Sequence, residues 1–185
     1  MLKFYSSVLG LKSILINDNV FKRVAKISLF LILTIIGAKI EISVEPVPFT
    51  LQTLFVVLSG AFLGKKDGFI AQSFYLLLGA IGIPVFAGPL AGLAKLIGPT
   101  GGYLLSFPIA AFIAGYFYEK WNSIVLLFIA TILSVLSIYL YGVVHLNLFY
   151  LHDFNRSIMA GAAIFSVWEI VKIIAAVFLY KGISR

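Results

Sequence analysis

The stretch SIVLLFIATILSVLSIYLY, residues 123–141, continues for nineteen positions without a charged side chain. A helix of that length spans the hydrocarbon core of a bilayer, which is about 30 Å thick. Other long apolar runs recur along the chain: of its 185 residues, 62% are hydrophobic and 11% are charged, and the mean hydropathy is +1.10. A soluble domain averages roughly 45–50% apolar and about 25% charged residues. The sequence therefore indicates an integral membrane protein.

The lengths of the apolar runs, which Gly, Pro and charged residues separate, predict an all-α polytopic membrane protein. It has six transmembrane helices in one domain, residues 24–182. The spans cover about residues 25–42, 49–63, 69–83, 102–117, 123–141 and 157–180. The continuous apolar runs disfavour a membrane β-barrel, whose strands alternate apolar and polar positions. Residues 1–23, in which Lys3 and Lys12 interrupt apolar stretches, have no A-x-A cleavage site. We expect them to form an amphipathic segment on the cytoplasmic surface of the membrane.

The distribution of Lys and Arg predicts the orientation, because short cytoplasmic loops carry the excess of basic residues. With the N-terminus inside, ten basic residues fall on the cytoplasmic side: Lys3, Lys12, Lys22, Arg23, Lys26, Lys65, Lys66, Lys120, Lys181 and Arg185. The opposite side has three basic residues and three acids: Lys39, Lys95, Arg156, Glu41, Glu45 and Asp153. We therefore predict a multi-pass protein of the plasma membrane with both termini in the cytoplasm.

Two outward connections differ from ordinary loops. The segment EISVEPVPFTLQ, residues 41–52, contains two prolines, and proline disfavours helix at the residue before it. We expect a stiff, non-helical hairpin over residues 44–48. The segment GIPVFAGPLAGLAKLIGPTGGY, residues 82–103, is apolar but too rich in Gly and Pro for a helix. Such backbone is tolerated at membrane depth only inside the protein or along a cavity, so we expect it to fold back into the protein.

Glu169 and Lys172 are the most informative polar residues, because they lie three positions apart in the apolar run VWEIVKIIAA, residues 167–176. On a helix, such residues share one face. A charge facing lipid costs about 2.5 kcal/mol or more, so ionisable residues in membrane spans usually serve function. The pair offers one acceptor and one donor, which suits a polar ring with N–H and C=O groups, or a carboxylate at the lysine. The alternative is an ion pair that only holds helices together.

Further candidate binding residues follow from their position in or near the irregular connections. Lys95 is an isolated cation in GLAKLIGPTGG, and it is equally compatible with a lysine reaching the outer interface. Gln52 and Thr50 project from the proline hairpin toward the second span. Aromatic walls for a ligand are expected from Tyr75, Phe86, Tyr103 and Trp168.

Catalysis has no support in the sequence. Cys is absent, and His145 and His152 lack the carboxylate cluster of a metal site. There is no Ser-His-Asp set, no HExxH motif and no ATP-binding motif, and the segment GPTGG lacks the spacing of a P-loop. We therefore expect no enzyme activity, no metal, no cofactor and no nucleic-acid partner.

Three segments together resemble the BioY family, the biotin-binding S components of energy-coupling factor (ECF) transporters. They are VPFTLQTLFVVLSGAFLGKKDG (47–68), YLLLGAIGIPVFAG (75–88) and GPTGGYLLSFPIAAFIAG (98–115), and the resemblance covers about residues 25–182. It implies a six-helix subunit, embedded in the lipid bilayer, that captures biotin from outside the cell and has as partners a transmembrane coupling subunit and two ATPase subunits. An S component for another small vitamin and a non-catalytic structural membrane protein are the alternatives. The combination of PFTLQ with GPTGGY disfavours the former.

The resemblance also implies roles for particular residues. Family members carry an acidic residue and a lysine, three positions apart, in the last helix, and here these are Glu169 and Lys172. In the favoured pose Glu169 accepts from the ureido N–H groups of biotin, Lys172 donates to its carbonyl, and the acid tail points toward Lys95 or the loop backbone. In the reverse pose Lys172 binds the carboxylate. The family's coupling surface, a small-xxx-small pattern on the first helix, corresponds to Thr34 and Ala38, with Gly37 adjacent.

Overall fold

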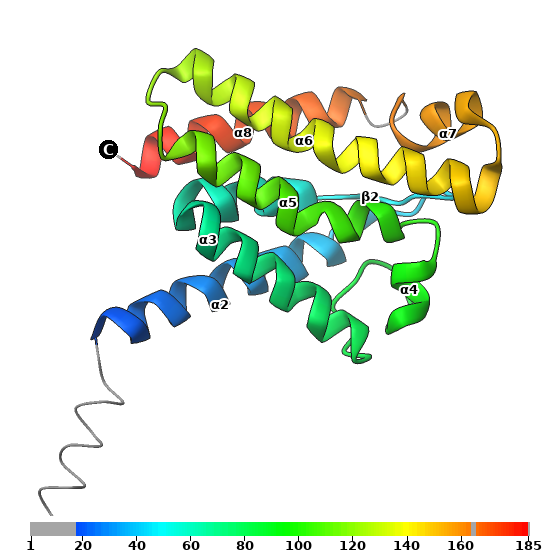
Figure 1. Ribbon diagram of the computed structural model, residues 1–185, viewed down its shortest axis with the longest axis horizontal. Coiled ribbons are helices and arrows are strands. Elements are labelled where there is room, and N and C mark those ends of the chain that lie inside the picture. Colours follow the sequence, from blue (N-terminus) through cyan, green and yellow to red (C-terminus); the bar gives the residue numbers. More distant parts are fainter. Residues whose placement is uncertain (1–17, 164–165, 185) are drawn as a thin grey trace, which may run out of the picture.

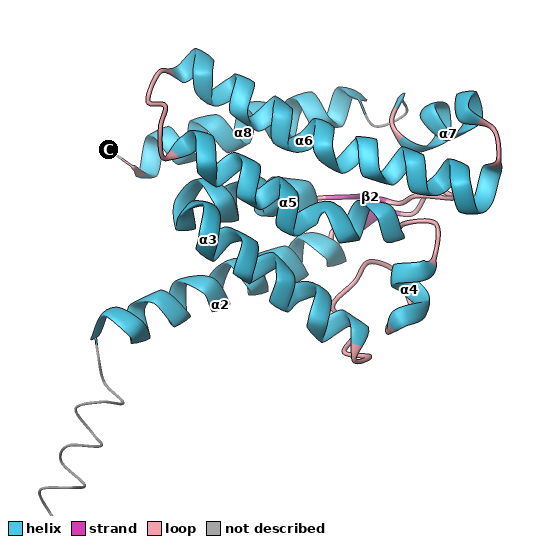
Figure 2. Cartoon of the chain, in the orientation of Figure 1, coloured by secondary structure: helices cyan, strands magenta, loops and turns pink. Residues whose placement is uncertain are grey.

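The structure is a computed structural model that describes residues 18–163 and 166–184. The long helices pack against one another in a bundle, with a two-stranded antiparallel sheet at one end (Figures 1 and 2). In chain order the elements are α2 (Asp18–Lys39), β1 (Glu41–Ile42), β2 (Phe49–Thr50), α3 (Gln52–Ala80), α4 (Leu93–Ile97), α5 (Gly101–Tyr118), α6 (Ile124–Leu146), η1 (Asn147–Leu151), α7 (Phe154–Gly161) and α8 (Ser166–Ile183). The predicted helical fold is confirmed. Of the predicted N-terminal segment, residues 1–17 lie outside the described residues, and residues 18–23 form the start of α2.

Helix α3 contains two of the predicted spans, because the chain reverses within it at Gly64. This residue has φ of 81° and ψ of 172°, a backbone conformation that residues other than glycine rarely adopt. Residues 52–63 and 65–80 then lie side by side: a Cβ built on Gly68 would be 2.7 Å from the Cα of Gly60. The predicted connection of several residues is thus reduced to a turn at one glycine.

Close backbone contact also joins α3 to α5. A Cβ on Gly60 would lie 2.1 Å from the carbonyl oxygen of Ala111, and one on Gly115 would lie 2.3 Å from the backbone nitrogen of Lys65. Helices in lipid associate through such close packing, because lipid tails are as apolar as the side chains. The two halves of α3 and helix α5 therefore form the tightly packed centre of the bundle.

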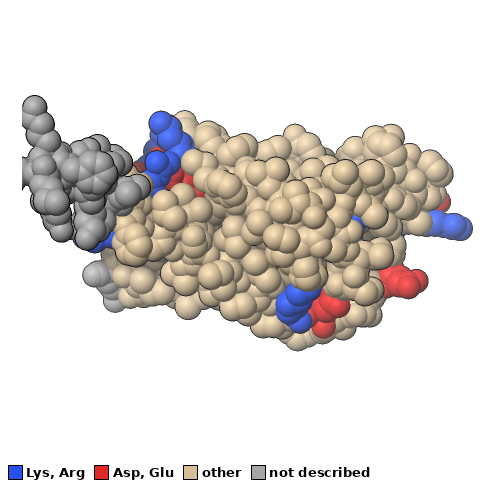
Figure 3. Space-filling model, turned by 90° about the horizontal axis from the view of Figure 1, so that it is seen from below, with Lys and Arg blue, Asp and Glu red and all other residues tan. Residues whose placement is uncertain are grey.

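The surface of the bundle is apolar over most of its length. Side chains such as Leu136, Leu140 and Phe178 are more than half exposed, at 57%, 64% and 57%. Figure 3 shows a face made mostly of uncharged residues, with the charged groups in a few small clusters. Two helices, Gly101–Tyr118 and Ile124–Leu151, are long and apolar enough by composition to cross a membrane. An apolar patch of this size on a single chain is typical of a surface that contacts lipid or another protein.

The connections lie at two opposite ends of the bundle (Figure 1). The beginning of α2, the turn at Gly64, the α5–α6 connection and the end of α8 share one end. The β1–β2 hairpin, α4 and the η1–α7 segment lie at the other end. The non-helical hairpin predicted for residues 44–48 is confirmed, because Glu41 pairs with Thr50 and Ile42 with Phe49 on either side of it.

Two predictions about helix continuity were wrong. The sixth span, predicted over residues 157–180, is divided into α7 and α8, with Ala162 outside helical geometry at φ −136° and ψ −51°. The carbonyl of Gly161 accepts a hydrogen bond of 2.9 Å from the Tyr103 hydroxyl, which satisfies a terminal carbonyl of α7 without a further turn. The second error concerns residues 82–103, in which the short helix α4 forms between Gly92 and Gly98.

Candidate substrate-binding site

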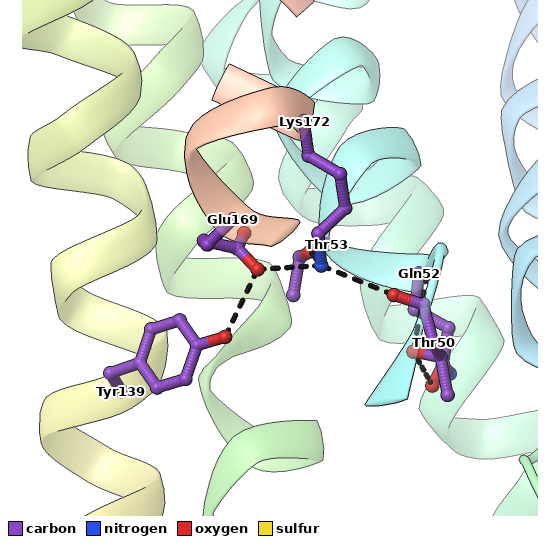
Figure 4. A network of polar contacts seen from close by, with 6 residues as sticks. All are labelled: Thr50, Gln52, Thr53, Tyr139, Glu169 and Lys172. Carbon is purple, nitrogen blue, oxygen red and sulfur yellow. Dashed lines mark hydrogen bonds and ion pairs between the residues drawn. The ribbon is translucent and has the colours of Figure 1, made fainter. Parts of the chain in front are cut away.

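The centre of the candidate site is a buried ion pair on α8. Lys172 Nζ lies 2.5 Å from Glu169 Oε2, and the two residues are only 6% and 5% exposed. They are separated by three positions on a helix, so both heads leave the same face of α8. Figure 4 shows the pair facing α6 on one side and the start of α3 on the other. The charges have therefore been placed in the interior and not toward the surface of the bundle.

Hydrogen bonds from three other elements fix this pair. Lys172 Nζ donates to the backbone carbonyl of Thr50 on β2, at 3.1 Å, and to the hydroxyl of Thr53 in the first turn of α3, at 2.6 Å. Tyr139 on α6 donates to Glu169 Oε2 at 3.0 Å (Figure 4). With Glu169, Thr50 and Thr53 as partners, all three N–H groups of the ammonium are used. Such charge-assisted bonds reduce the large cost of burying two charges.

One acceptor of the pair is left over. Glu169 Oε1 is buried and has no hydrogen-bond partner within the described part of the chain. A carboxylate can accept at both oxygens, and an unpaired buried acceptor costs roughly 1–3 kcal/mol. A group that donates a hydrogen bond at this position would remove that cost.

A cavity opens beside the pair, toward the end of the bundle that carries the hairpin and α4. It encloses about 570 Å³ of space between atoms, part of it continuous with solvent. Residues from the hairpin, the loops before α4 and α5 and five helices line it: Val47, Pro48, Phe49, Thr50, Gln52, Thr53, Ala87, Lys95, Thr100, Tyr103, Leu104, Phe107, Ile138, Tyr139 and Lys172. Most of the wall is apolar or aromatic, with a few hydroxyl, amide and ammonium groups. This composition is typical of a small-molecule site.

Four of the eight predicted binding residues line this cavity: Lys172, Lys95, Gln52 and Tyr103. Gln52 is 4% exposed, and its amide donates to the Tyr75 hydroxyl at 2.5 Å and accepts from the Thr50 hydroxyl at 3.0 Å. Lys95 is half-buried and has no ion-pair or hydrogen-bond partner among the described residues. The cavity thus contains one paired and one unpaired lysine.

The other four predicted residues lie behind or outside the wall. Glu169 is connected to the cavity through two lining residues, Lys172 and Tyr139, and it lines a smaller neighbouring space itself. Tyr75 and Phe86 are fully buried and pack edge to face, with ring centroids 5.4 Å apart. Tyr75 acts indirectly, because its hydroxyl accepts from Gln52 and donates to the Val85 carbonyl.

Trp168 does not line the cavity. It is 53% exposed, and its ring lies 5.6 Å from that of Phe49 on the outer side of α8. Successive residues of a helix differ by about 100° in direction, so the neighbour of an inward-facing Glu169 faces away from it. The expectation of an aromatic wall at this position therefore does not agree with the geometry.

The predicted coupling surface requires a correction. Thr34, Gly37 and Ala38 are all buried: Thr34 and Ala38 are 0% exposed, and a Cβ on Gly37 would lie 2.7 Å from Phe55. The Thr34 hydroxyl also accepts from the Gln72 amide of α3 at 3.1 Å. The small residues of α2 therefore allow close packing against α3 inside the chain, and in the single chain their side chains are buried.

Sequence reasoning missed several residues of the wall, among them Phe49, Thr53, Thr100 and Tyr139. The ring of Phe49 lies 4.7 Å from Lys172 Nζ, and the Thr100 hydroxyl is buried without a partner in the described part of the chain. Two of these residues, Phe49 and Thr100, lie in the motifs PFTLQ and GPTGGY, so these motifs could have identified them.

His145, by contrast, contacts the Gly98 carbonyl at 3.1 Å and supports the loop before α5. Among residues 18–163 and 166–184 no three His, Asp or Glu side chains gather as metal ligands would.

Comparison with known proteins assigns this arrangement to a family. The model of the BioY family matches residues 11–185. The chain belongs to the BioY family. The predicted resemblance is thereby confirmed, and it extends beyond the region from which it was inferred.

Relatives in the BioY family cover nearly the whole chain. A probable biotin transporter BioY from Pyrococcus horikoshii is 44% identical over 163 residues, which are 88% of this chain and 96% of the relative. The biotin transporter BioY from Thermotoga maritima is 41% identical over 164 residues, which are 89% of this chain and 96% of the relative. Among solved structures, the 2.1 Å crystal structure of the S-component for biotin from an ECF-type ABC transporter matches with a TM-score of 0.83. It is 25% identical and covers 91% of this chain and 93% of its own.

Proposed function

We propose that this chain is the membrane-embedded S component that captures biotin from outside the cell for uptake by an ECF-type transporter. The observation that carries the proposal is the cavity with a neutral ion pair, Glu169–Lys172, at its deep end and the unpaired Lys95 at its rim. Biotin has the complementary distribution of charge: a neutral ureido ring at one end, an apolar thioether ring between, and a carboxylate at the other end.

Charge favours the pose with the ureido ring at the deep end. Lys172 is already neutralised by Glu169 at 2.5 Å, so a second carboxylate there would leave an excess negative charge in the interior. Lys95 forms no ion pair in the described part of the chain, although Glu41 and Lys39 interact with it electrostatically at longer range, and it is half-buried. The carboxylate of biotin therefore binds at Lys95, where part of its hydration is retained.

Hydrogen bonding at the deep end refines the roles of the pair. Since the three N–H groups of Lys172 have partners, the ureido carbonyl is bound by the Thr53 hydroxyl, whose oxygen already accepts from Lys172. The unpartnered hydroxyl of Thr100 is a second group on the wall that can donate or accept. Glu169 Oε1 is the natural acceptor for a ureido N–H after a small movement of the Lys172 side chain.

The orientation in the membrane follows from the ends of the bundle. In the proposed topology six segments cross the bilayer: α2, both halves of α3, α5, α6 and α8. Lys22, Arg23, Lys26, Lys65, Lys66, Lys120 and Lys181 then belong to the cytoplasmic end, as the distribution of basic residues requires. The cavity opens toward the opposite, external end. Cysteines introduced at Lys65 and Lys120 should react with a membrane-impermeant reagent only from inside, and one at Asp153 only from outside.

Transport itself requires partners, because the sequence contains no ATP-binding motif. A coupling subunit and two ATPase subunits in the plasma membrane are part of the proposal. They are supported by the family and by the crystal structure of the S-component for biotin. Since Thr34 and Ala38 are buried in the single chain, we expect the coupling subunit to contact exposed residues around them.

The decisive experiment is the identification of the bound molecule. The protein is purified in mild detergent, denatured, and the released small molecules are analysed by mass spectrometry. We expect biotin, in a ratio to protein that falls sharply in the Lys172→Ala variant. Another vitamin in its place would show an S component of different specificity, and no retained or bindable vitamin would support a structural role.

A further inference from the structure

We infer that the chain carries a second binding site, for an anionic phospholipid, at the end of the bundle opposite the biotin cavity. The site is composed of an apolar groove that runs along α2, α3 and α8, and of a basic hollow at the end of that groove. It lies apart from every residue of the proposed biotin site.

The groove is lined almost entirely by apolar side chains. Leu29 and Leu33 come from α2, Leu58 and Phe62 from the first half of α3, and Leu179 and Ile183 from α8. Leu29 is 52% exposed and Ile183 is 69% exposed, although each has neighbours from the other two helices. A hollow of this kind between three helices receives one extended hydrocarbon chain better than a flat helix surface does, because the chain gains contacts on three sides.

The basic hollow continues the groove toward the end of the bundle. Lys26, Phe62 and Leu63 line both spaces, so the two form one continuous surface. Lys22 and Arg23 complete the hollow together with Asp67. Figure 3 shows a cluster of blue Lys and Arg side chains at the end of the molecule where α2 begins.

Charge at the hollow is unbalanced. Arg23 is neutralised by Asp67, to which it donates three hydrogen bonds of 2.6–3.0 Å. Lys22 and Lys26 have no ion-pair or hydrogen-bond partner within residues 18–163 and 166–184. They are four positions apart on α2, so their ammonium groups project from the same face and can bind one phosphate together. A basic pocket between helices at the cytoplasmic side is the type of surface that binds anionic headgroups.

The two halves of the site together specify the ligand. A phosphate diester bearing a negative charge fits between Lys22 and Lys26, and an acyl chain attached to it lies along Leu29, Leu33 and Leu179. A free phosphate would use only the hollow, and an apolar helix of another subunit would use only the groove. An anionic phospholipid of the cytoplasmic leaflet uses both. The proposed orientation of the chain determines only in which leaflet the bound phospholipid lies. The preference of this site for an anionic phospholipid does not depend on biotin binding.

Native mass spectrometry of the full chain in detergent tests this site. We expect phosphatidylglycerol to be retained in preference to phosphatidylcholine with the same acyl chains. In the double variant Lys22→Gln/Lys26→Gln the preference should fall by about fivefold for each lysine removed. The matched control is Lys66→Gln/Lys120→Gln, which removes two lysines from the same end but outside the groove. This control should retain the preference.

The acyl chain is tested separately. Leu179→Trp fills the groove and should lower phosphatidylglycerol binding severalfold, whereas Leu136→Trp on the exposed side of α6 should not. Elution at the same volume in size-exclusion chromatography shows that each variant is folded. Equal retention of the two lipids, or equal losses in the two double variants, would overturn the proposal. So would binding of glycerophosphoglycerol, which has no acyl chain, as strongly as the lipid, since the groove would then contribute nothing.

Discussion

The deep end and the rim of the cavity each contain one lysine, and the two differ in almost every respect. Lys172 is 6% exposed and bonded to Glu169, Thr50 and Thr53. Lys95 is half-buried on the short helix α4, with no ion-pair partner in the described part of the chain. One lysine is held rigidly and is electrically neutral with its partner, whereas the other keeps its charge for a ligand. The two lysines thus provide a pair without net charge in one place and a cation without an ion-pair partner among the described residues in the other.

The strongest test of this difference is removal of the buried pair. Lys172→Ala or Glu169→Ala should weaken biotin binding by about 2 kcal/mol or more, because the remaining charge is buried without its partner. Isothermal titration calorimetry in detergent measures this loss. The matched control is Lys181→Ala, because Lys181 lies near the end of the same helix and contacts Asn122. This variant should bind biotin normally.

A double variant separates binding from stability at the same site. Glu169→Gln/Lys172→Met replaces the pair with uncharged groups of similar volume, and such replacements are often neutral or stabilising. We expect a folded protein that no longer binds biotin. A double variant that is folded and binds biotin normally would show that the pair only holds helices together.

Thr53 provides the next largest effect. Thr53→Val keeps the shape of the side chain but removes the hydroxyl that accepts from Lys172 and faces the cavity. Without this hydroxyl the ureido carbonyl of bound biotin would be buried without its donor, which costs about 1–3 kcal/mol, and we expect biotin binding to fall by an amount in this range. Thr34→Val removes a buried hydroxyl far from the cavity and should lower the melting temperature without changing affinity.

At the rim the expected effect is smaller and depends on the ligand. Lys95→Gln should reduce biotin affinity by about 1 kcal/mol, since a half-exposed ion pair is weakened by solvent. Biotinamide, which has no carboxylate, should bind the wild type and Lys95→Gln equally. An equal loss for both ligands would place the carboxylate elsewhere, and a loss confined to Lys172 variants would favour the reverse pose.

The smallest effect is expected for Glu169→Asp. The shorter side chain keeps the charge on the same face of α8 and only lengthens the contact with Lys172, which is 2.5 Å in this chain. We expect biotin affinity to change by less than about tenfold, or 1.4 kcal/mol. A loss as large as that of Glu169→Ala would mean that the position of the carboxylate matters more than its charge.

The sequence predicted the charged residues of the site better than its uncharged ones, for a physical reason. Two charges in an apolar run are conspicuous, because a membrane span tolerates them only in the interior. A threonine or tyrosine in such a run is common, so Thr53 and Tyr139 could be recognised only once the fold had brought α3, α6 and α8 together. Trp168 shows that proximity in sequence to a site residue does not predict a place in the site, because Trp168 adjoins Glu169 and yet faces the outside of the bundle.

The positions of the helices were predicted from the lengths of the apolar runs. The errors in these positions lie where the length of a run does not reveal an interruption or a short helix. The sequence AGAAIF, residues 160–165, is apolar and free of proline, so nothing in it indicated that α7 would end at Gly161. At the interruption the Gly161 carbonyl is bound by the Tyr103 hydroxyl, which comes from a residue 58 positions away in the chain. Likewise, α4 is short and flanked by glycines, so neither periodicity nor length predicted it.

The glycines at the centre of the bundle limit how this chain can vary between species. At Gly60 and Gly115 a Cβ would meet backbone atoms at 2.1 Å and 2.3 Å, and no substitution of a neighbouring side chain can move those atoms away. A lipid-facing leucine such as Leu136 or Leu140 can be exchanged for another apolar residue without any compensating change. Descendants of this sequence should therefore diverge rapidly over their outer surface while they inherit the two glycines almost unaltered. Relatives that have lost them must hold α3 and α5 farther apart.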